Sequence, residues 1–335
     1  MRTLYLTVAL ALCLSSGLSA ADAKYPIVNE VELLEKIKKT GVELIKAGKA
    51  KSSKQLCKQL HERPTCELAL PPVRTQPIGD KELYASACES IFIVVGMAKS
   101  KEEPGEWEFS SATAFAVTED GVLSTCYHVF GDPEPLEGFF AVNVAGDVVP
   151  VEEVLAADQK QDTCLFRIAT KGLKPLPLGE NVVPGSKVRI VSHPGYFFYF
   201  YSEGNVGNYY QDEDKTNWVN VTADFGQGSS GAPVFDEHGN VVGQVDSTLT
   251  LFAGGPAEEV DPMIKCRRLT AAGHVVPVKK PMAEVKPKPD QPKGEGKKKK
   301  KVEPKPEPEL PGDPQMVFKT CTPAAGMRAL VKEKK

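Results

Sequence analysis

The feature that most constrains the fold is a series of short apolar runs between residues 90 and 245. The runs are rich in β-branched and aromatic residues, and Gly, Pro, Asp or Asn separates each from the next, which is the pattern of short strands. Such spacing predicts an all-β barrel or sandwich rather than an α/β sheet. The strand-like runs are Ser90–Gly96, Ala112–Val117, Val122–Thr125, Phe139–Val144, Val148–Val154, Cys164–Ile168, Val188–Ser192, Trp218–Thr222, Ala232–Phe235 and Val241–Val245.

Three further segments flank this β region, which we place at residues 84–270. Residues 1–23 have the pattern of a signal peptide, with Arg2, a short apolar stretch and small residues before Ala23. Residues 24–83 show apolar side chains at helical spacing and then a proline-rich linker, which predicts a short α-helical N-terminal segment. Residues 271–335 form a Pro/Lys/Glu-rich tail that we expect to be disordered, although its last part regains apolar residues that favour a short helix or weak docking.

Charge, hydropathy and cysteine spacing exclude several classes of function. A formal net charge of -3 argues against nucleic acid as a partner. The apolar stretch Leu4–Leu14 is too short to span a bilayer, and none follows that is long enough, so we expect a secreted or periplasmic protein without a membrane span. Without a CxxC pair or a histidine at zinc-finger spacing, we expect no structural zinc site. The serine chemistry considered below also needs no metal and no cofactor. The basic run Lys297–Lys301 is interpreted as a solvated linker, or as a weak electrostatic contact with anionic surfaces.

The segment Gly228–Pro233 (GSSGAP) is the strongest local signal for chemistry. A nucleophilic serine needs an exposed hydroxyl on a tight turn, with backbone N–H groups aimed at the developing oxyanion. Glycines on both sides of Ser229 and Ser230 permit such a turn. Taken alone, the segment is equally well explained as a Gly/Ser loop before a strand.

Two more candidate residues precede this loop. His128 comes just after the run Val122–Thr125, a position where a base could be held rigidly. His61 and His274 lie outside the β region, and His193 and His238 lie in predicted turns. Asp162 precedes the run Cys164–Ile168, where a carboxylate could orient an imidazole. Either residue alone is better explained as an ordinary strand-end or turn residue.

Together, the order His128, Asp162, Ser230 resembles the trypsin-like serine proteases, and is most similar to bacterial HtrA-type protease domains, here without a PDZ domain. The likeness covers roughly residues 86–270. It implies two six-stranded antiparallel barrels, with the catalytic residues His128, Asp162 and Ser230 in the cleft between them. It also implies an oxyanion hole from the N–H groups of Gly228 and Ser230, and a serine endopeptidase acting on protein or peptide substrates.

The chain departs from that family at several positions. Ser229 stands where trypsin has the aspartate that captures a new N-terminus, so that activation route is absent. Cys126 and Cys164 each lie two residues from a proposed catalytic residue, either as a disulfide or as two buried thiols. Asp224 lies six residues before Ser230, where the resemblance implies the base of the substrate-binding S1 pocket and a preference for Lys or Arg; alternatively it accepts hydrogen bonds within its own loop.

Two alternatives belong to other classes of function. Cys126 beside the histidine could misplace His128, and the chain would then be a catalytically silent, protease-like peptide-binding module. The Lys/Pro-rich tail suggests a surface-associated scaffold.

Overall fold

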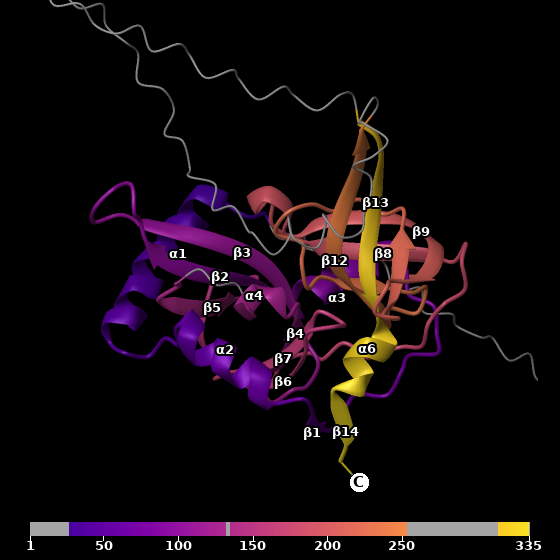
Figure 1. Cartoon of the computed structure of the whole chain (residues 1–335), viewed down its shortest axis with the longest axis horizontal. Helices are drawn as coiled ribbons and strands as arrows, with labels where there is room; N and C mark the ends of the chain where they lie inside the picture. Colours follow the sequence, from indigo (N-terminus) through magenta and orange to yellow (C-terminus); the bar gives the residue numbers. More distant parts are fainter. Residues whose placement is uncertain (1–26, 132–134, 253–313, 335) are drawn as a thin grey trace, which may run out of the picture.

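The described part of the chain consists of two closed β-barrels that lie side by side (Figure 1). The structure is a computed structural model, and it describes residues 27–131, 135–252 and 314–334. Each barrel has six strands, and all strand pairs within the barrels are antiparallel. The predicted fold class, all-β with two six-stranded antiparallel barrels, is therefore confirmed. The predicted signal peptide, the basic run and residues 271–313 of the expected tail lie outside the described residues.

Each strand of the first barrel overlaps one of the strand-like runs in the sequence, although several strands are longer than expected. In β2 every residue from Ile91 to Met97 is buried, because the strand is covered on both faces. Phe92 and Val94 belong to the barrel interior, whereas Ile93 and Val95 face the helical N-terminal segment. The strands of this barrel are β2 (Ile91–Lys99), β3 (Trp107–Ala116), β4 (Val122–Thr125), β5 (Gly138–Val142), β6 (Val148–Asp158) and β7 (Thr163–Ile168).

The N-terminal segment is helical, as expected, and it packs on the outside of the first barrel. Helix α1 (Glu30–Lys46) is capped by Asn29, whose side chain accepts a hydrogen bond from the N–H of Glu32. Gly41 lies inside this helix, where a Cβ atom would lie 2.3 Å from Met97 Sδ, so the glycine lets α1 approach β2 closely. The other elements of this segment are α2 (Ser53–Glu62), β1 (Cys66–Leu68) and α3 (Asp80–Cys88).

The second barrel requires a correction to the predicted domain boundaries. Its sixth strand is β13 (Pro314–Pro323), which pairs with both β10 and β12. The expectation that the domain ends at residue 270 and that residues 271–335 are disordered is therefore wrong for residues 314–334. Without this segment the barrel would be open between β10 and β12. The other strands are β8 (Lys187–Ser192), β9 (Phe200–Gln211), β10 (Asn217–Val221), β11 (Pro233–Phe235) and β12 (Val241–Phe252).

A buried apolar cluster joins the two barrels to both ends of the described chain. Phe115 and Leu165 come from the first barrel and Phe235 from the second. Helix α3 adds Leu83, and helix α6 (Ala324–Ala329) adds Met327. Beyond α6, β14 (Val331–Glu333) pairs in parallel with β1, so the C-terminal end of the described chain joins the N-terminal segment between α2 and α3. The relative placement of the barrels thus depends on segments at both ends.

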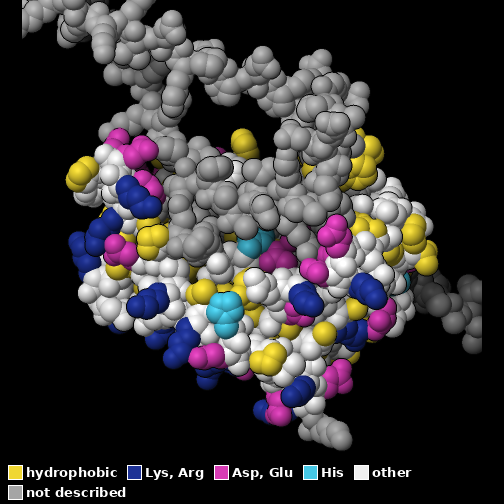
Figure 2. Space-filling model, viewed as in Figure 1, with side chains coloured by type: hydrophobic (Ala, Val, Ile, Leu, Met, Phe, Trp, Pro, Cys, Tyr) yellow, Lys and Arg dark blue, Asp and Glu magenta, His cyan; other side chains and the backbone are white. Residues whose placement is uncertain are grey.

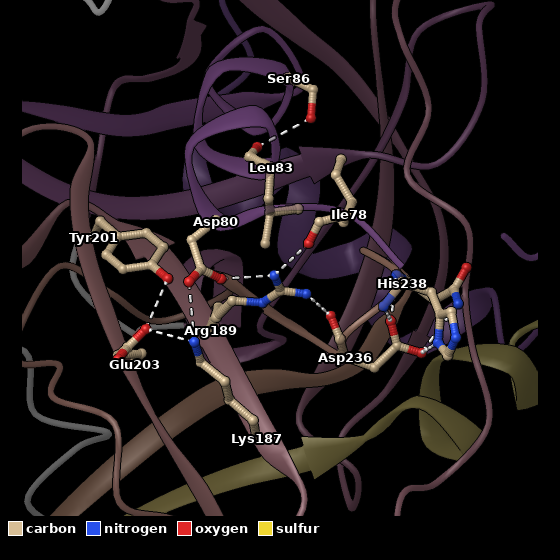
Figure 3. Close-up of polar contacts among 11 residues, drawn as sticks. Ile78, Asp80, Leu83, Ser86, Lys187, Arg189, Tyr201, Glu203, Asp236 and His238 are labelled. Atoms are coloured by element: carbon tan, nitrogen blue, oxygen red, sulfur yellow. Dashed lines mark hydrogen bonds and ion pairs between the residues drawn. The ribbon is translucent and has the colours of Figure 1, made fainter. Parts of the chain in front are cut away.

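A buried arginine ties the N-terminal segment to the second barrel (Figure 3). Arg189 of β8 has a side chain only 3% exposed. Its guanidinium donates hydrogen bonds to the Ile78 carbonyl at 3.0 Å, to Asp80 Oδ1 at 2.9 Å and to the Asp236 carbonyl. Lys187 pairs with Asp80 as well, at 3.0 Å, but is half exposed. The two cations lower the pKa of the Asp80 carboxyl, chiefly through their hydrogen bonds.

The Arg189 contacts predict a large difference between two neighbouring substitutions. Arg189→Met would remove one hydrogen-bond donor from each of three acceptors: the Ile78 carbonyl, the Asp236 carbonyl and the Asp80 carboxylate. We expect it to lower the free energy of unfolding by about 2–4 kcal/mol. Lys187→Met removes an exposed pair with the same aspartate and should cost less than about 1 kcal/mol. Urea denaturation of both variants measures this, and equal losses would show that the Arg189 contacts do not stabilise the fold.

The surface is charged but not uniformly basic. On the face shown in Figure 2, lysine and arginine side chains gather on the side formed by α1 and α2, with acidic side chains among them. None of the helices in the described ranges combines the length and apolar character needed to cross a membrane.

Candidate active site

His128 and Asp162 meet at the end of the first barrel that faces the second. His128 begins the short helix α4 (His128–Gly131) shortly after β4, and Asp162 lies in the turn between β6 and β7. The Nδ1 atom of His128 lies 2.6 Å from Asp162 Oδ2, and the backbone N–H of His128 donates to Asp162 Oδ1 at 2.9 Å. Both carboxylate oxygens therefore contact one residue, which fixes the plane of the carboxylate and the orientation of the ring.

The surroundings of Asp162 keep it ionised. Burial by itself would raise the pKa of this carboxyl, but the charge and hydrogen bonds of His128 and a hydrogen bond from Asp246 outweigh burial and hold the pKa well below its usual range. Asp162 also has a φ of +46°, a left-handed conformation that Asp and Asn adopt more readily than other residues with a Cβ. An ionised, oriented carboxylate is what an imidazole base needs behind it.

The loop that carries Ser230 has a backbone that requires its glycines. Gly228 has a φ of +95° and Gly231 a φ of +88°. A Cβ atom at Gly228 would lie 2.4 Å from the His193 carbonyl oxygen, and one at Gly231 would lie 2.1 Å from the Thr113 carbonyl oxygen. The spacing of glycines in the sequence thus reflects a tight turn pressed against both barrels.

Thr113 of β3 links this loop to the first barrel. Its hydroxyl donates to the Gly228 carbonyl at 2.9 Å, and its N–H donates to the Ser230 carbonyl at 2.8 Å. These bonds use the carbonyl groups of Gly228 and Ser230. Their N–H groups donate to no residue that the structure describes. Two such N–H groups on one tight turn are the donors that an oxyanion hole uses.

Asp246 of β12 links Ser230 to the His128–Asp162 pair. Its Oγ donates to the main-chain oxygen of Asp246 at 3.3 Å. The Asp246 carboxyl has an oxygen within 4.8 Å of a donor atom of both His128 and Asp162. The structure therefore places His128 and Asp162 in direct contact and Ser230 beside Asp246, with the Ser230 hydroxyl pointing to a carbonyl of β12.

Ser229 and the turn after β8 support the loop from behind. The Ser229 hydroxyl, fully buried, donates to Ser192 Oγ at 3.0 Å, so a neutral hydrogen bond holds this side chain. His193 accepts a hydrogen bond from the Tyr199 N–H at 3.0 Å, and burial lowers the pKa of His193 to about 3, which keeps this ring neutral. The N–H of Gly195 in the same turn donates to the Gln227 carbonyl at 2.7 Å, just before Gly228.

Cysteines near the site are thiols in the structure. Cys126 and Cys164 are both fully buried, and neither forms a disulfide. The other cysteines among the described residues, Cys57, Cys66, Cys88 and Cys321, are free as well. Burial, and then the charge of Asp162, raises the pKa of both Cys126 and Cys164 far above the usual range, so neither is a thiolate nucleophile. Cys126 Sγ instead donates to the Val245 carbonyl at 3.1 Å.

One group of side chains has the composition of a metal site. Donor atoms of Cys126, His128, Asp162 and Asp246 all lie within 4.8 Å of one another. Thiol, imidazole and carboxylate ligands suit zinc. The 2.6 Å contact between His128 Nδ1 and Asp162 Oδ2, however, is a hydrogen bond and leaves no space for an ion between them. The arrangement favours acid–base chemistry over metal binding.

Asp224 does not present an unpaired carboxylate. Its side chain is 84% exposed, and Lys319 Nζ of β13 lies 2.8 Å from Asp224 Oδ1. Lys319 also donates to the Phe225 carbonyl at 3.2 Å. The preference for a substrate with lysine or arginine bound at Asp224 stays a prediction. The cationic side chain of such a substrate would compete with Lys319 for the Asp224 carboxylate.

Asp246 was missed in the sequence. It ends an apolar run, and an aspartate in that position is an ordinary strand-end residue. Its position beside the other site residues follows from the pairing of β12 with β11 and β13, which the sequence does not show. Lys319 was missed for a similar reason, because it lies beyond the low-complexity segment.

Comparison with known families agrees with this geometry. Residues 112–243 match the family model described as a trypsin-like peptidase domain. This part of the chain is similar to trypsin-like peptidase domains. His128, Asp162 and Ser230 all lie inside the matched range, whereas β13 and the helical N-terminal segment lie outside it.

The relatives of this trypsin-like domain are distant. The chain is 26% identical over 151 residues to a probable periplasmic serine endoprotease, DegP-like, of Pseudomonas fluorescens, which covers 44% of this chain and 31% of that protein. It is also 26% identical over 177 residues to the anti-sigma-I factor RsgI9 of Acetivibrio thermocellus, covering 51% of this chain and 23% of that protein. The chain thus spans about a quarter to a third of the length of these curated relatives.

Two solved structures with weak similarity to this chain are described as proteases. The HtrA-type protease AlgW with a decapeptide has a TM-score of 0.45 and 15% identity, covering 51% of this chain and 59% of that chain. An active-form protease from M. tuberculosis has a TM-score of 0.43 and 18% identity, covering 55% and 82%.

Proposed function

We propose that this protein is a serine endopeptidase that hydrolyses peptide bonds through an acyl-enzyme on Ser230. The observation that carries the proposal is the two-point contact between Asp162 and His128, beside the loop that presents Ser230. The match to a trypsin-like peptidase domain supports it. No observation favours the alternatives of a silent peptide-binding module or a surface scaffold.

In the proposed reaction, the Ser230 hydroxyl turns from the Asp246 carbonyl to Nε2 of His128 and attacks the scissile carbonyl. His128 accepts the serine proton through Nε2 while its Nδ1–H remains bonded to Asp162. The C–N bond then breaks, and His128 gives the proton to the leaving amine. A water attacks the acyl-enzyme by the same route and releases Ser230.

The oxyanion of each tetrahedral intermediate would be held by the N–H groups of Gly228 and Ser230. Thr113 fixes the two carbonyls of this turn, so the donors are already oriented before substrate binds. Preorganised donors of this kind contribute a factor of roughly 10²–10³ each in turnover.

We also propose that the protein acts outside the cytoplasm. The signal-like pattern of residues 1–23 supports this, as does the similarity to a relative described as probably periplasmic. All six cysteines among the described residues are free, and four of them are buried. The fold of the described residues therefore does not require an oxidising compartment.

Labelling with a fluorophosphonate probe tests the proposed function. Such a probe reacts only with a serine that has an assembled base and oxyanion hole. We expect the folded full-length chain to be labelled, with the adduct on Ser230 by peptide mapping and no adduct in Ser230→Ala. Folded protein that stays unlabelled, in both reducing and oxidising buffer, would refute an active enzyme.

A further inference from the structure

The proposed catalytic residues share their surroundings with a second carboxyl group, that of Asp246. This residue lies on β12, and its main-chain oxygen accepts the hydrogen bond from Ser230. A side-chain oxygen of Asp246 lies within 4.8 Å of donor atoms of both Asp162 and His128. The Ser247 hydroxyl donates to Asp246 Oδ2 at 2.6 Å. The main chain of Asp246 thus contacts Ser230, while its side chain lies beside the Asp162 carboxylate.

Two carboxylates cannot both be ionised comfortably at this separation in a partly buried site. Among the residues that the structure describes, the other titratable groups around Asp246 are His128 from α4, Cys126 from the segment after β4, and Cys321 from β13. None of them is a permanent cation, and both thiols are kept neutral by burial. Like charges this close, without a fixed counter-charge, are relieved when the two groups hold one proton between them.

The hydrogen bonds indicate which residue keeps that proton. Asp162 accepts from the N–H and from Nδ1 of His128, so both its oxygens already serve as acceptors and the ionised form is favoured. Only one oxygen of Asp246, Oδ2, accepts from Ser247, and the carboxyl group of Asp246 can therefore carry the proton. Burial and then the charge of Asp162 raise the pKa of Asp246 well above its ordinary value, in agreement with this assignment.

We propose that Asp246 is a positioning residue whose protonated carboxyl donates a hydrogen bond to the Asp162 carboxylate, so that a proton-sharing pair of acids orients His128. This inference rests on the proposed function for its effect on catalysis. The bond would keep Asp162 in the rotamer that meets His128 at two points. Deprotonation of Asp246 at high pH would turn this attraction into repulsion and loosen the pair.

The first test reads the proton directly and needs no activity. Full-length protein with ¹³C-labelled aspartate carboxyl groups is titrated by NMR, and Asp246→Asn identifies the Asp246 signal. We expect the Asp246 carboxyl carbon to keep its neutral shift through the range near pH 4 in which ordinary aspartates titrate. A signal that titrates there would overturn the proposal.

The second test measures the rate constant for fluorophosphonate labelling of Ser230. Asp246→Ala removes the donor, and we expect a loss of about 10–100-fold, the range of a hydrogen bond to a charged group. Asp246→Asn keeps an N–H donor and should restore the rate to within about 3-fold. Wild type should lose rate at alkaline pH as Asp246 ionises, and Asp246→Asn should lack that loss. Equal rates and equal pH profiles in all three proteins would overturn the positioning role.

Stability gives a third readout with a definite sign. A carboxyl whose pKa is raised by folding is bound to its proton more tightly in the native state, so wild type loses stability as pH rises above the ordinary carboxyl range, up to the raised pKa. Asp246→Asn has no such loss. We therefore expect its melting temperature, relative to wild type, to be higher at pH 7 than at pH 4, and a difference independent of pH would contradict the shared proton.

The outcomes separate this inference from the proposed function. A neutral Asp246 carbon in a protein that the probe never labels would refute the peptidase and leave the acid pair standing. Labelling of Ser230 in a protein whose Asp246 titrates near pH 4 would refute the acid pair and leave the peptidase standing.

Discussion

Asp162→Asn is expected to lower the rate constant for labelling of Ser230 about 10⁴-fold, equivalent to roughly 5.5 kcal/mol, without disturbing the fold. The two oxygens of Asp162 now accept from two donors on His128, its N–H and its Nδ1–H. An amide offers only one oxygen. If that oxygen stays with the backbone N–H, the NH₂ group faces Nδ1 and forces the ring into the tautomer with hydrogen on Nε2. That ring cannot accept the Ser230 proton.

The backbone at this position makes asparagine a clean substitution. Asp162 has a φ of +46°, and asparagine tolerates the left-handed region as well as aspartate does. Asp158→Asn, in the same turn, is the matched control: its Oδ1 accepts only from backbone N–H groups nearby, such as that of Lys160 at 2.8 Å, and we expect a change of no more than about 3-fold. Circular dichroism checks that both variants fold. Similar rates for the two variants would show that Asp162 does not orient the base.

The first barrel could be predicted because its strands are locally encoded. β4 begins and ends at the expected residues, and β7 differs from the expectation by one residue. Turn residues bound each of them, and no long-range information is needed to see the pattern. The helical N-terminal segment could be recognised as helical, but not that Ile37 of α1 covers Ile93 and Val95, because periodicity shows an apolar face and not its partner.

The site could be predicted only as far as its residues sit in local motifs. Ser230 lies between glycines whose positive φ angles the turn requires, and His128 and Asp162 lie at strand ends. Asp246 has no local signature, and its place beside Asp162 arises from the closure of the second barrel. The same closure brings Lys319 to Asp224 across 95 residues of sequence. Contacts of this kind depend on which strands pair, and composition does not reveal that.

Truncation after residue 313 is expected to abolish cooperative folding of the second barrel. The deletion removes β13, whose ladder joins β10 to β12, and with it the buried Cys321. It also removes Met327 and Leu330 from the cluster between the barrels, at about 1.5–3 kcal/mol for each large side chain. Together with the lost ladder, this approaches the whole stability of an ordinary domain, about 5–15 kcal/mol. Thermal melting by circular dichroism and limited proteolysis measure the loss.

The strand register suggests a control variant that removes more residues than the truncation but should lower the stability much less. Phe252 at the end of β12 pairs with Pro314 at the start of β13, so a short turn is long enough to join them. We expect replacement of residues 253–313 by such a turn to leave the melting temperature within a few degrees of wild type, because β13 still closes the barrel. It should also keep Thr322, whose hydroxyl donates at 2.8 Å to the carbonyl of Gln161, the neighbour of Asp162. A truncated chain that melts cooperatively at the wild-type temperature would mean that the barrel closes without β13, and the domain boundary at residue 270 would have to be restored.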